Sequence, residues 1–367
     1  MLNIYILNVN KGESIVLHHE KELKHSFAVI DSYSVGQQTP PALSKLQELG
    51  AERLSFVALT HPHADHYIGL SEIVEFYQNK IDNFYSFPLG LYNDESRLKK
   101  FASIYKEIYK NSDDEKVKRD TKAFVQLLVS VKNHIGLDNW EELTGNNSPM
   151  YPVGFEDIEI CSLLPPPKVK GDFFHKIDEG TYQPQTDKEN DLSFALCVKY
   201  KGYEIILGGD GTKENWEYHK IQLGRKSETL NGNVVKLPHH GSKRDCTPGI
   251  ISYLFADNEE KHACISASGG KHPHPSVLKE LQAQGIKPYC TNLSRACGAS
   301  KELLDEGHYG LDPVFIRYLN IMSSERSSHS IAPCQGTITI SIDINNHLAI
   351  HREYNTLCPF RNEFDFL

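Results

Sequence analysis

A short run of histidine and aspartate, THPHADH at residues 60–66, constrains this chain more than any other feature. The apolar segment LSFVAL precedes it and predicts a buried strand that ends where the run begins. Imidazole nitrogens and carboxylate oxygens are ligands that suit zinc, manganese or iron. Side chains alternate in an extended loop, so His61 and His63 face one point while Asp65 and His66 face another. The run therefore predicts a loop that holds two metal ions about 3.5–4 Å apart.

The order of the predicted elements favours two β-sheets with helices outside them. LNIYILNV, SIVLHH and SFAVIDSY predict strands, and PALSKLQELG predicts a helix. LSFALCVKY and EIILGGD predict a hairpin around a Lys-Gly turn, and HPSVLKELQAQG predicts another helix. TITISIDINNHLAIHREY predicts a last hairpin that turns at Asn345 and Asn346. This order predicts an αββα sandwich, which we interpret as one domain over residues 1–367.

Two stretches interrupt this pattern. Residues from about 91 to 145 are rich in Lys and Glu and have helical periodicity, so we interpret them as a helical insertion over the strand layers. The insertion is either a solvated helical pair without function or a cap that orients the substrate. Residues from about 168 to 191 are polar and predict a loop.

The spacing of the THPHADH run resembles the signature of the metallo-β-lactamase superfamily, and the resemblance covers most of the chain outside the insertion and part of the C-terminal region. It implies the αββα fold and a site for two divalent ions, zinc or manganese, with magnesium also allowed. It implies that Asp31, in FAVIDSY, supports the metal loop from behind. Asp210, in IILGGDG, would bridge the two metals. In VVKLPHHGS, His239 would be a metal ligand, and His240 a general acid or a support for the ligands, although the sequence does not decide which of the two binds the metal.

Several segments resemble the hydrolase domain of ComEC-type competence proteins, which import DNA and whose soluble domain is thought to degrade one strand. These segments are PHHGS, LNVNKGESIVL, SLLPPP, NDLSFALCVKY and GGKHPHPSVLKEL. The chain departs from that pattern at Asn8 and Asn10, which stand where the subgroup often has an Asp-Val-Gly-like turn. It also lacks a clear match to the superfamily's third histidine motif.

The missing histidine leaves the first metal with a short set of ligands. His134 and His175 are the only histidines between the metal loop and Asp210, and we expect both to lie on the surface. The first ion would then be held by His61, His63, Asp210 and water. Such a set weakens selectivity for zinc and leaves manganese or magnesium open.

Further polar residues follow the paired histidines. His272 and His274, in GGKHPHPS, either donate to a phosphate oxygen or belong to an ordinary loop before a helix. Ser242 and Lys243 are candidates for the same contact, although Ser242 would also serve as a local backbone cap. We rank His272 with Asp65 and His240 as catalytic candidates.

Charge and composition bear on the substrate and the cellular compartment that we expect for this protein. The formal net charge is -9, so a nucleic-acid substrate would depend on the metals or on local cations such as Lys243, Arg244 and Lys271. No run of about 18 apolar residues predicts a membrane span. The sequence starts without a basic, apolar leader, and its eight cysteines have no CxxC spacing. We therefore expect a cytoplasmic protein with reduced thiols.

These observations predict a metal-dependent hydrolase, in first place a phosphodiesterase or nuclease that acts on DNA. Asp65 or Asp210 would hold the attacking water, His240 would protonate the leaving oxygen, and His272 or Lys243 would stabilise charge on the phosphoryl oxygens. Two alternatives stay open. One is a hydrolase of a small substrate such as a cyclic nucleotide, lactone or thioester. The other is a metal-binding, non-catalytic subunit that meets protein partners in a bacterial defence assembly.

Overall fold

Alternation along the strands divides the apolar side chains between separate cores. The computed structural model describes residues 1–34, 38–90, 95–145, 148–184, 188–225, 229–255, 260–268, 271–292, 294 and 336–353. In strand β2 (Ile15–Lys21), Ile15 and Leu17 pack between the two sheets, whereas Val16 packs under the outer helices. In β9 (Ala195–Tyr200), Leu196 packs between the sheets and Cys197 packs on the outer side. Period-two patterning thus produces a central core and two outer cores.

The first sheet is mixed. Within the described residues it has the strand order β15-β14-β1-β2-β3-β4-β5-β6. The pairs from β3 to β6 are parallel, and the pairs from β15 to β3 are antiparallel. Its strands besides β2 are β1 (Leu2–Ile6), β3 (Lys24–Ile30), β4 (Leu54–Leu59), β5 (Ile81–Ser86), β6 (Trp140–Glu142), β14 (Ile338–Ile342) and β15 (Leu348–Arg352).

The second sheet has the order β13-β12-β11-β10-β9-β8-β7 in the described part of the chain. The pairs from β10 to β13 are parallel, and the pairs from β7 to β10 are antiparallel. Its strands besides β9 are β7 (Pro149–Met150), β8 (Glu159–Leu164), β10 (Tyr203–Leu207), β11 (Val234–Lys236), β12 (His262–Ile265) and β13 (Lys287–Cys290).

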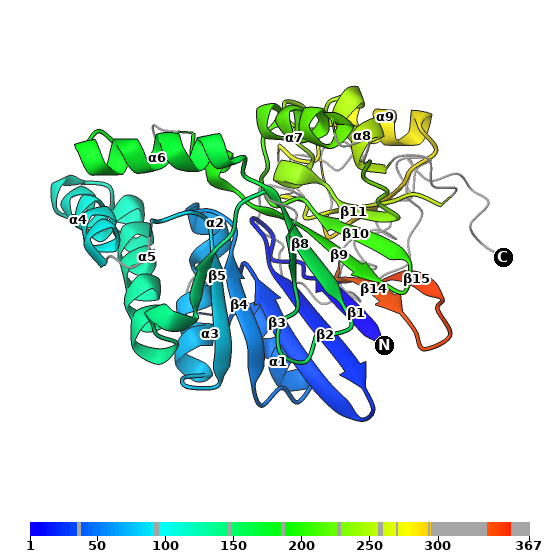
Figure 1. Ribbon diagram of the computed structural model, residues 1–367, viewed down its shortest axis with the longest axis horizontal. Coiled ribbons are helices and arrows are strands. Elements are labelled where there is room, and N and C mark those ends of the chain that lie inside the picture. Colours follow the sequence, from blue (N-terminus) through cyan, green and yellow to red (C-terminus); the bar gives the residue numbers. More distant parts are fainter. Residues whose placement is uncertain are drawn as a thin grey trace, which may run out of the picture.

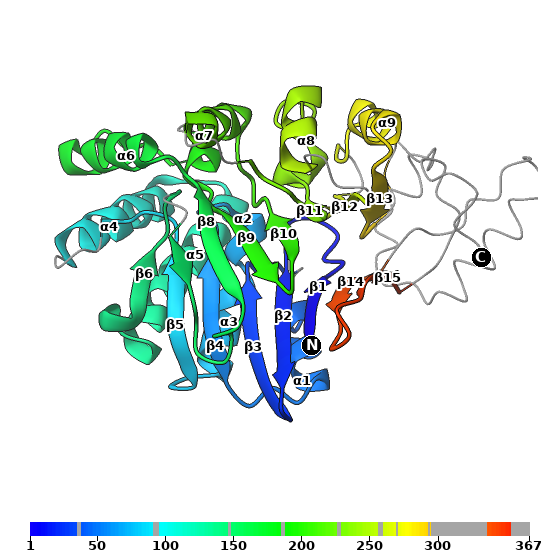
Figure 2. The ribbon, with the colours of Figure 1, turned by 45° about the vertical axis from the view of Figure 1, so that its right-hand side comes forward.

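Helices cover the outer faces of both sheets, which confirms the αββα sandwich (Figure 1). Figure 2 shows α7, α8 and α9 together along the second sheet, with α1 on the far side of the first. None of the described helices has the length and apolar content that crossing a membrane requires. The helices are α1 (Pro41–Glu48), α2 (Ala64–Tyr67), α3 (Leu70–Phe76), α4 (Glu95–Asn111), α5 (Glu115–His134), α6 (Pro167–Glu179), α7 (Lys213–Arg225), α8 (Pro248–Phe255) and α9 (Pro275–Ala283).

The predicted hairpins are confirmed. β9 and β10 pair around Lys201 and Gly202, which both have positive φ, and β14 and β15 pair around a turn that contains Asn346 at φ 64°. The predicted loop over residues 168–191 is wrong, because α6 occupies most of its first half. Pro167 begins this helix and Gly180 ends it in the left-handed conformation.

The predicted helical insertion contains α4 and α5. One face of this pair is buried, since Phe101, Phe124 and Leu127 belong to the same core as the outer face of the first sheet. One face of the insertion is therefore packed on the sandwich, and its role as a cap stays a prediction.

Candidate metal centre

The residues of the three chemical motifs follow strands of different sheets. The THPHADH run follows β4 of the first sheet, Asp210 follows β10 of the second, and the paired histidines follow β11. β3 and β4 are parallel, as are β10 and β11, so these strands direct their carboxyl ends to common edges. Such edges of parallel strands are where α/β proteins place their ligands. Here the edges of the two sheets meet.

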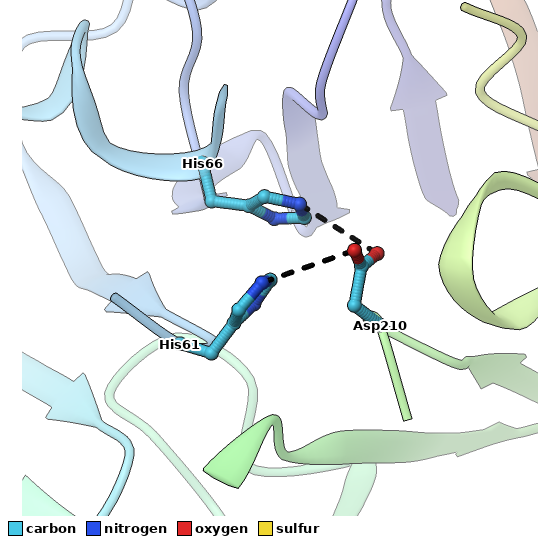
Figure 3. A group of neighbouring side chains, drawn as sticks. All are labelled: His61, His66 and Asp210. Atoms are coloured by element: carbon cyan, nitrogen blue, oxygen red, sulfur yellow. Dashed lines mark ion pairs between the residues drawn. The ribbon is translucent and has the colours of Figure 1, made fainter. Parts of the chain in front are cut away.

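Asp210 is the centre of the group. His66 Nε2 lies 3.6 Å and His240 Nε2 lies 3.5 Å from its Oδ1 atom. His61 Nε2 lies 3.8 Å and His239 Nε2 lies 3.9 Å from its Oδ2 atom. Figure 3 shows His61 and His66 pointing at the carboxylate from one side. Each carboxylate oxygen thus faces two imidazoles, which is the arrangement that a carboxylate bridging two cations requires.

Several buried polar atoms around Asp210 lack hydrogen-bond partners within the described residues. His61 Nε2, His66 Nε2, His240 Nε2 and Asp210 Oδ1 are buried, and none of them has a hydrogen-bond partner among the described residues. Buried polar atoms without partners are costly and rare in native proteins. Divalent cations at these groups would satisfy the four atoms, so the donor set fits metal. Groups whose ligand atoms lie within 4.8 Å of one another are His61, His66 and Asp210; Asp65, His66 and His240; and Glu13, Asp210 and His240.

Burial and neighbouring charges shift the pKa values of the side chains in this group. Burial favours the neutral form of Asp210, but His240 and His66 outweigh it and hold the pKa of this carboxyl well below its usual range. Burial lowers the pKa of His61 well below its usual value and that of His240 to about 4. Burial opposes charge on His66 as well, but Asp210 and Asp31 raise the pKa of His66 well above its usual value. Burial thus favours the neutral form of His61 and His240, which is the form of imidazole that binds metal.

Asp31 lies behind the metal loop, at the place that the family resemblance implies. Its carboxylate accepts from His66 Nδ1 at 2.6 Å and from the amide and hydroxyl of Thr60 at 2.8 and 2.7 Å. A proton on Nδ1 leaves Nε2 of His66 to face Asp210. Asp31 itself has φ 54°, a left-handed backbone that few residue types adopt.

The paired histidines have separate surroundings. His240 is buried, and its Nδ1 donates to the Ser266 carbonyl at 3.0 Å, which directs Nε2 to Asp210. His239 is partly exposed, and its Nδ1 lies 2.6 Å from an oxygen of Asp245. Burial lowers the pKa of His239, but the hydrogen bond to Asp245 and the charges of Asp210 and Asp245 together outweigh it and raise the pKa above its usual value. Only His240 belongs to the closely spaced groups within the described residues, so the geometry distinguishes the two side chains.

Asp65 lies at the open side of the group. Its side chain is 43% exposed, and Oδ2 lies 3.9 Å from His240 Nε2. The loop after β1 supports it, because the Glu13 amide donates to the Asp65 carbonyl at 3.0 Å. Gly12 has φ 83°, and a Cβ on it would lie 2.0 Å from the same carbonyl oxygen. Only glycine permits this close approach.

The residues predicted to contact phosphate have different surroundings in the structure; they are His272, His274, Ser242 and Lys243. His272 is adjacent, with its ring centroid 5.6 Å from that of His239, and its buried Nδ1 has no hydrogen-bond partner in the part of the chain that the structure describes. Lys243 is exposed. Ser242 accepts from the Arg244 amide at 3.2 Å, which is a local cap, and His274 caps the start of α9 by accepting from Ser276.

The histidines without a motif are remote from this chemistry. His175 is exposed on α6, where it pairs with Glu179 at 3.3 Å. His134 is the last residue of α5. Neither belongs to the groups found among the described residues. His175 lies on the surface as predicted, whereas His134 is half-buried.

Two acidic residues at the site were not predicted. Glu13 is buried and forms an ion pair with buried Lys236, whose Nζ also donates to the Gly209 carbonyl at 3.0 Å. Glu189 is buried, and its Oε2 lies 3.4 Å from His63 Nε2. Each stands alone in a polar stretch of sequence, and a lone glutamate has no spacing that identifies it as a ligand.

Comparisons by sequence find no family model and no curated protein that matches this chain. Comparison of structures finds similarity to AidC, a dizinc quorum-quenching lactonase, at 11% identity over 54% of this chain and 56% of that one, with TM-score 0.31. A metallo-β-lactamase from Staphylococcus aureus subsp. aureus COL is similar at 13% identity over 61% and 51%, with TM-score 0.30. A diphosphatase of the PhnP family is similar at 11% identity over 78% and 94%, with TM-score 0.37. The chain thus spans about half the length of the first two structures.

Proposed function

We propose that this protein is a metal-dependent hydrolase of the metallo-β-lactamase superfamily that cleaves phosphodiester bonds, with DNA as its substrate. The observation that carries the proposal is the Asp210 carboxylate, whose two oxygens face four imidazoles, while buried ligand atoms lack hydrogen-bond partners among the residues that the structure describes. Two divalent cations at such a site supply a nucleophilic hydroxide at neutral pH and neutralise charge at phosphorus. The residues that would hold them are His61, His63, Asp65, His66, Asp210 and His240.

In this proposal the neighbouring side chains donate a proton and contact the substrate. His239, hydrogen-bonded to Asp245 and partly exposed, is the proton donor for the leaving oxygen in this proposal. This exchanges the roles that the family resemblance implies for His239 and His240. His272, beside His239, would donate to a non-bridging phosphate oxygen. Exposed Lys243 and Lys271 near these residues would contact the backbone of a nucleic acid.

Degradation of fluorescent single-stranded DNA tests the proposal. The protein is incubated with Mn²⁺ or Zn²⁺, with EDTA as one control and the isosteric variant Asp210→Asn as the other. We expect cleavage only by the wild type with metal. Protein that binds two ions yet cleaves neither DNA nor a small-substrate panel would instead support the non-catalytic subunit.

A cavity beside the metal group favours the small-substrate alternative as a second candidate. It has a volume of about 420 Å³, which lies in the range of small-molecule pockets. Its lining includes the aromatic rings of Phe173 and Tyr182, the cations Lys176 and Lys188, and Glu189, which also faces His63. A cyclic nucleotide, lactone and thioester should be assayed with the same variants. Faster hydrolysis of one of these than of DNA would favour this candidate.

A further inference from the structure

Glu189 has the surroundings of a metal ligand. It lies in the short 3-10 helix Glu189–Leu192 that precedes β9 and is 3% exposed. One carboxylate oxygen, Oε2, lies 3.4 Å from His63 Nε2. Two ligand atoms bound to one tetrahedral ion at about 2.0–2.1 Å are separated by about 3.4 Å. The spacing therefore suits two neighbours on the same cation.

The other oxygen of Glu189 is held by two phenols. Oε1 accepts from the hydroxyl of Tyr105 at 3.0 Å and from the hydroxyl of Tyr182. Tyr105 belongs to α4, so the helical insertion orients this carboxylate. Donors that hold one oxygen of a carboxylate and direct the other are typical of the groups behind a metal ligand.

The segment after Glu189 also belongs to the metal group. The side-chain amide of Asn190 lies 3.4 Å from the His239 ring nitrogens, and the Ser193 hydroxyl accepts from the Asp210 amide at 2.9 Å. His61 and His63 have ring centroids 4.6 Å apart. Glu189 thus lies on the side of the site where His61 and His63 were left without a third histidine.

We propose that Glu189 is a ligand of the ion that His61 and His63 hold, in the place of a third histidine. The inference rests on the proposed metal-dependent function and extends it to the identity of the ion. An additional carboxylate oxygen in place of an imidazole makes the set harder, which favours Mn²⁺ relative to Zn²⁺.

Metal counting tests this without an activity assay. Wild type, Glu189→Gln and the neighbouring control Asp191→Asn are dialysed against Mn²⁺, and bound metal is measured by elemental analysis and calorimetry. Asp191 accepts from Thr212 and not from the site residues, so its variant should bind two ions like the wild type. Glu189→Gln should retain the ion of His66 and His240, and bind the other at least about tenfold more weakly.

A second variant separates coordination from structural support. Glu189→His restores an imidazole and should bind two ions with a higher ratio of Zn²⁺ to Mn²⁺ affinity than the wild type. A merely structural ion pair with His63 would leave that ratio unchanged. Should Glu189→Gln fail to fold by circular dichroism, the ratio in Glu189→His decides alone.

The two proposals fail in different ways. Wild type that binds no metal would remove the proposed function. Wild type and Glu189→Gln that both bind two ions with equal affinity, or Glu189→His with an unchanged ion preference, would overturn only the role of Glu189.

Discussion

Residues at the metal centre adopt a backbone conformation that side chains usually avoid. Asp31, His239 and His240 have φ of 54°, 46° and 53°, and Gly241 follows at 77°. Left-handed residues other than glycine cost free energy and persist where the surroundings hold them, often at functional sites. Here hydrogen bonds to Thr60, Asp245 and Ser266 hold the three side chains. The turns direct these side chains to the centre.

Asp31→Asn should weaken metal binding without unfolding the protein. Asparagine tolerates the left-handed backbone, but it removes the charge that accepts from His66 Nδ1. Loss of such a supporting group costs about 10- to 100-fold in metal affinity. Competition with a chromophoric chelator measures the affinity. Wild-type affinity in the variant would show that Asp31 does not orient His66.

His239→Asn and His240→Asn form a matched pair, because asparagine suits the left-handed backbone at both positions. His240→Asn should lose an ion, since Nε2 of His240 faces Asp210 and Asp65. His239→Asn should keep both ions and lower turnover by about 10²- to 10⁴-fold, as expected for loss of a proton donor. Metal content and kcat are measured for each. The reverse result would restore the ligand role of His239.

At the scale of elements, α5 is part of the core. Phe124 is fully buried against Tyr67, Phe101 and Tyr105, whereas Val129 on the same helix is 52% exposed. Phe124→Ala should lower the free energy of unfolding by about 3–5 kcal/mol. Val129→Ala should change it by less than about 0.5 kcal/mol. Urea denaturation compares them, and equal small losses would mean that α5 is only loosely attached.

The β2–β3 hairpin predicts a sensitivity to acid. His18 stacks on Phe27 and pairs with His25 at 2.9 Å. Burial, with His25 beside it, lowers the pKa of His18 from 6.5 to about 4. The unfolded chain then binds a proton that the native protein resists, so the free energy of unfolding falls as pH drops from about 6.5 to 4.

His18→Gln should remove this part of the acid-induced loss, because glutamine does not titrate. Unfolding is followed between pH 7 and 4 in EDTA, which removes any contribution from bound ions. His175→Gln, at an exposed position on α6, is the control and should behave as the wild type does. Identical slopes for both variants would contradict the role of His18.

Elements with a strong pattern were predictable from sequence, and α6 was not. The helix starting at Pro275 and both hairpins have periodic apolar residues between clear turn signals. α6 buries only Phe173 and Ile177 and has Gly171 within it. Two buried positions in a charged segment give a weak periodicity, so local pattern favoured a loop and tertiary packing decided otherwise.

The candidate site likewise contains residues that a sequence pattern predicts and residues that it does not. The THPHADH run and Asp210 belong to short motifs that follow buried strands, and the sequence predicted that they would meet. Their meeting in the structure agrees with this, while their roles as ligands stay predictions. Glu189 and Glu13 become visible only when the chain is folded, because their partners Tyr105, His63 and Lys236 are distant in sequence. Spacing along the chain does not encode such contacts.

At the scale of the whole molecule, binding of the proposed ions would join the two sheets. His66 follows the first sheet and Asp210 the second, so a shared cation adds a connection between them. A ligand that binds only the native state raises the free energy of unfolding by about 2.7 kcal/mol when its free concentration is about 100 times its Kd. Mn²⁺ should stabilise the wild type by this order and EDTA should reverse it, as measured by urea denaturation. Asp210→Asn should show no such gain, and an equal gain in it would place the ion elsewhere.

The contribution of both sheets to one centre has a consequence during synthesis. When the ribosome has completed only strands β1 to β6 and their helices, the emerging polypeptide already contains the histidines of the metal loop but lacks Asp210 and His240. It then has ligand atoms from only one side of the proposed centre. Under the proposed function, hydrolytic capacity would arise only after strands β7 to β11 of the second sheet have been translated and have docked, and fragments from interrupted translation would be inert toward the substrate.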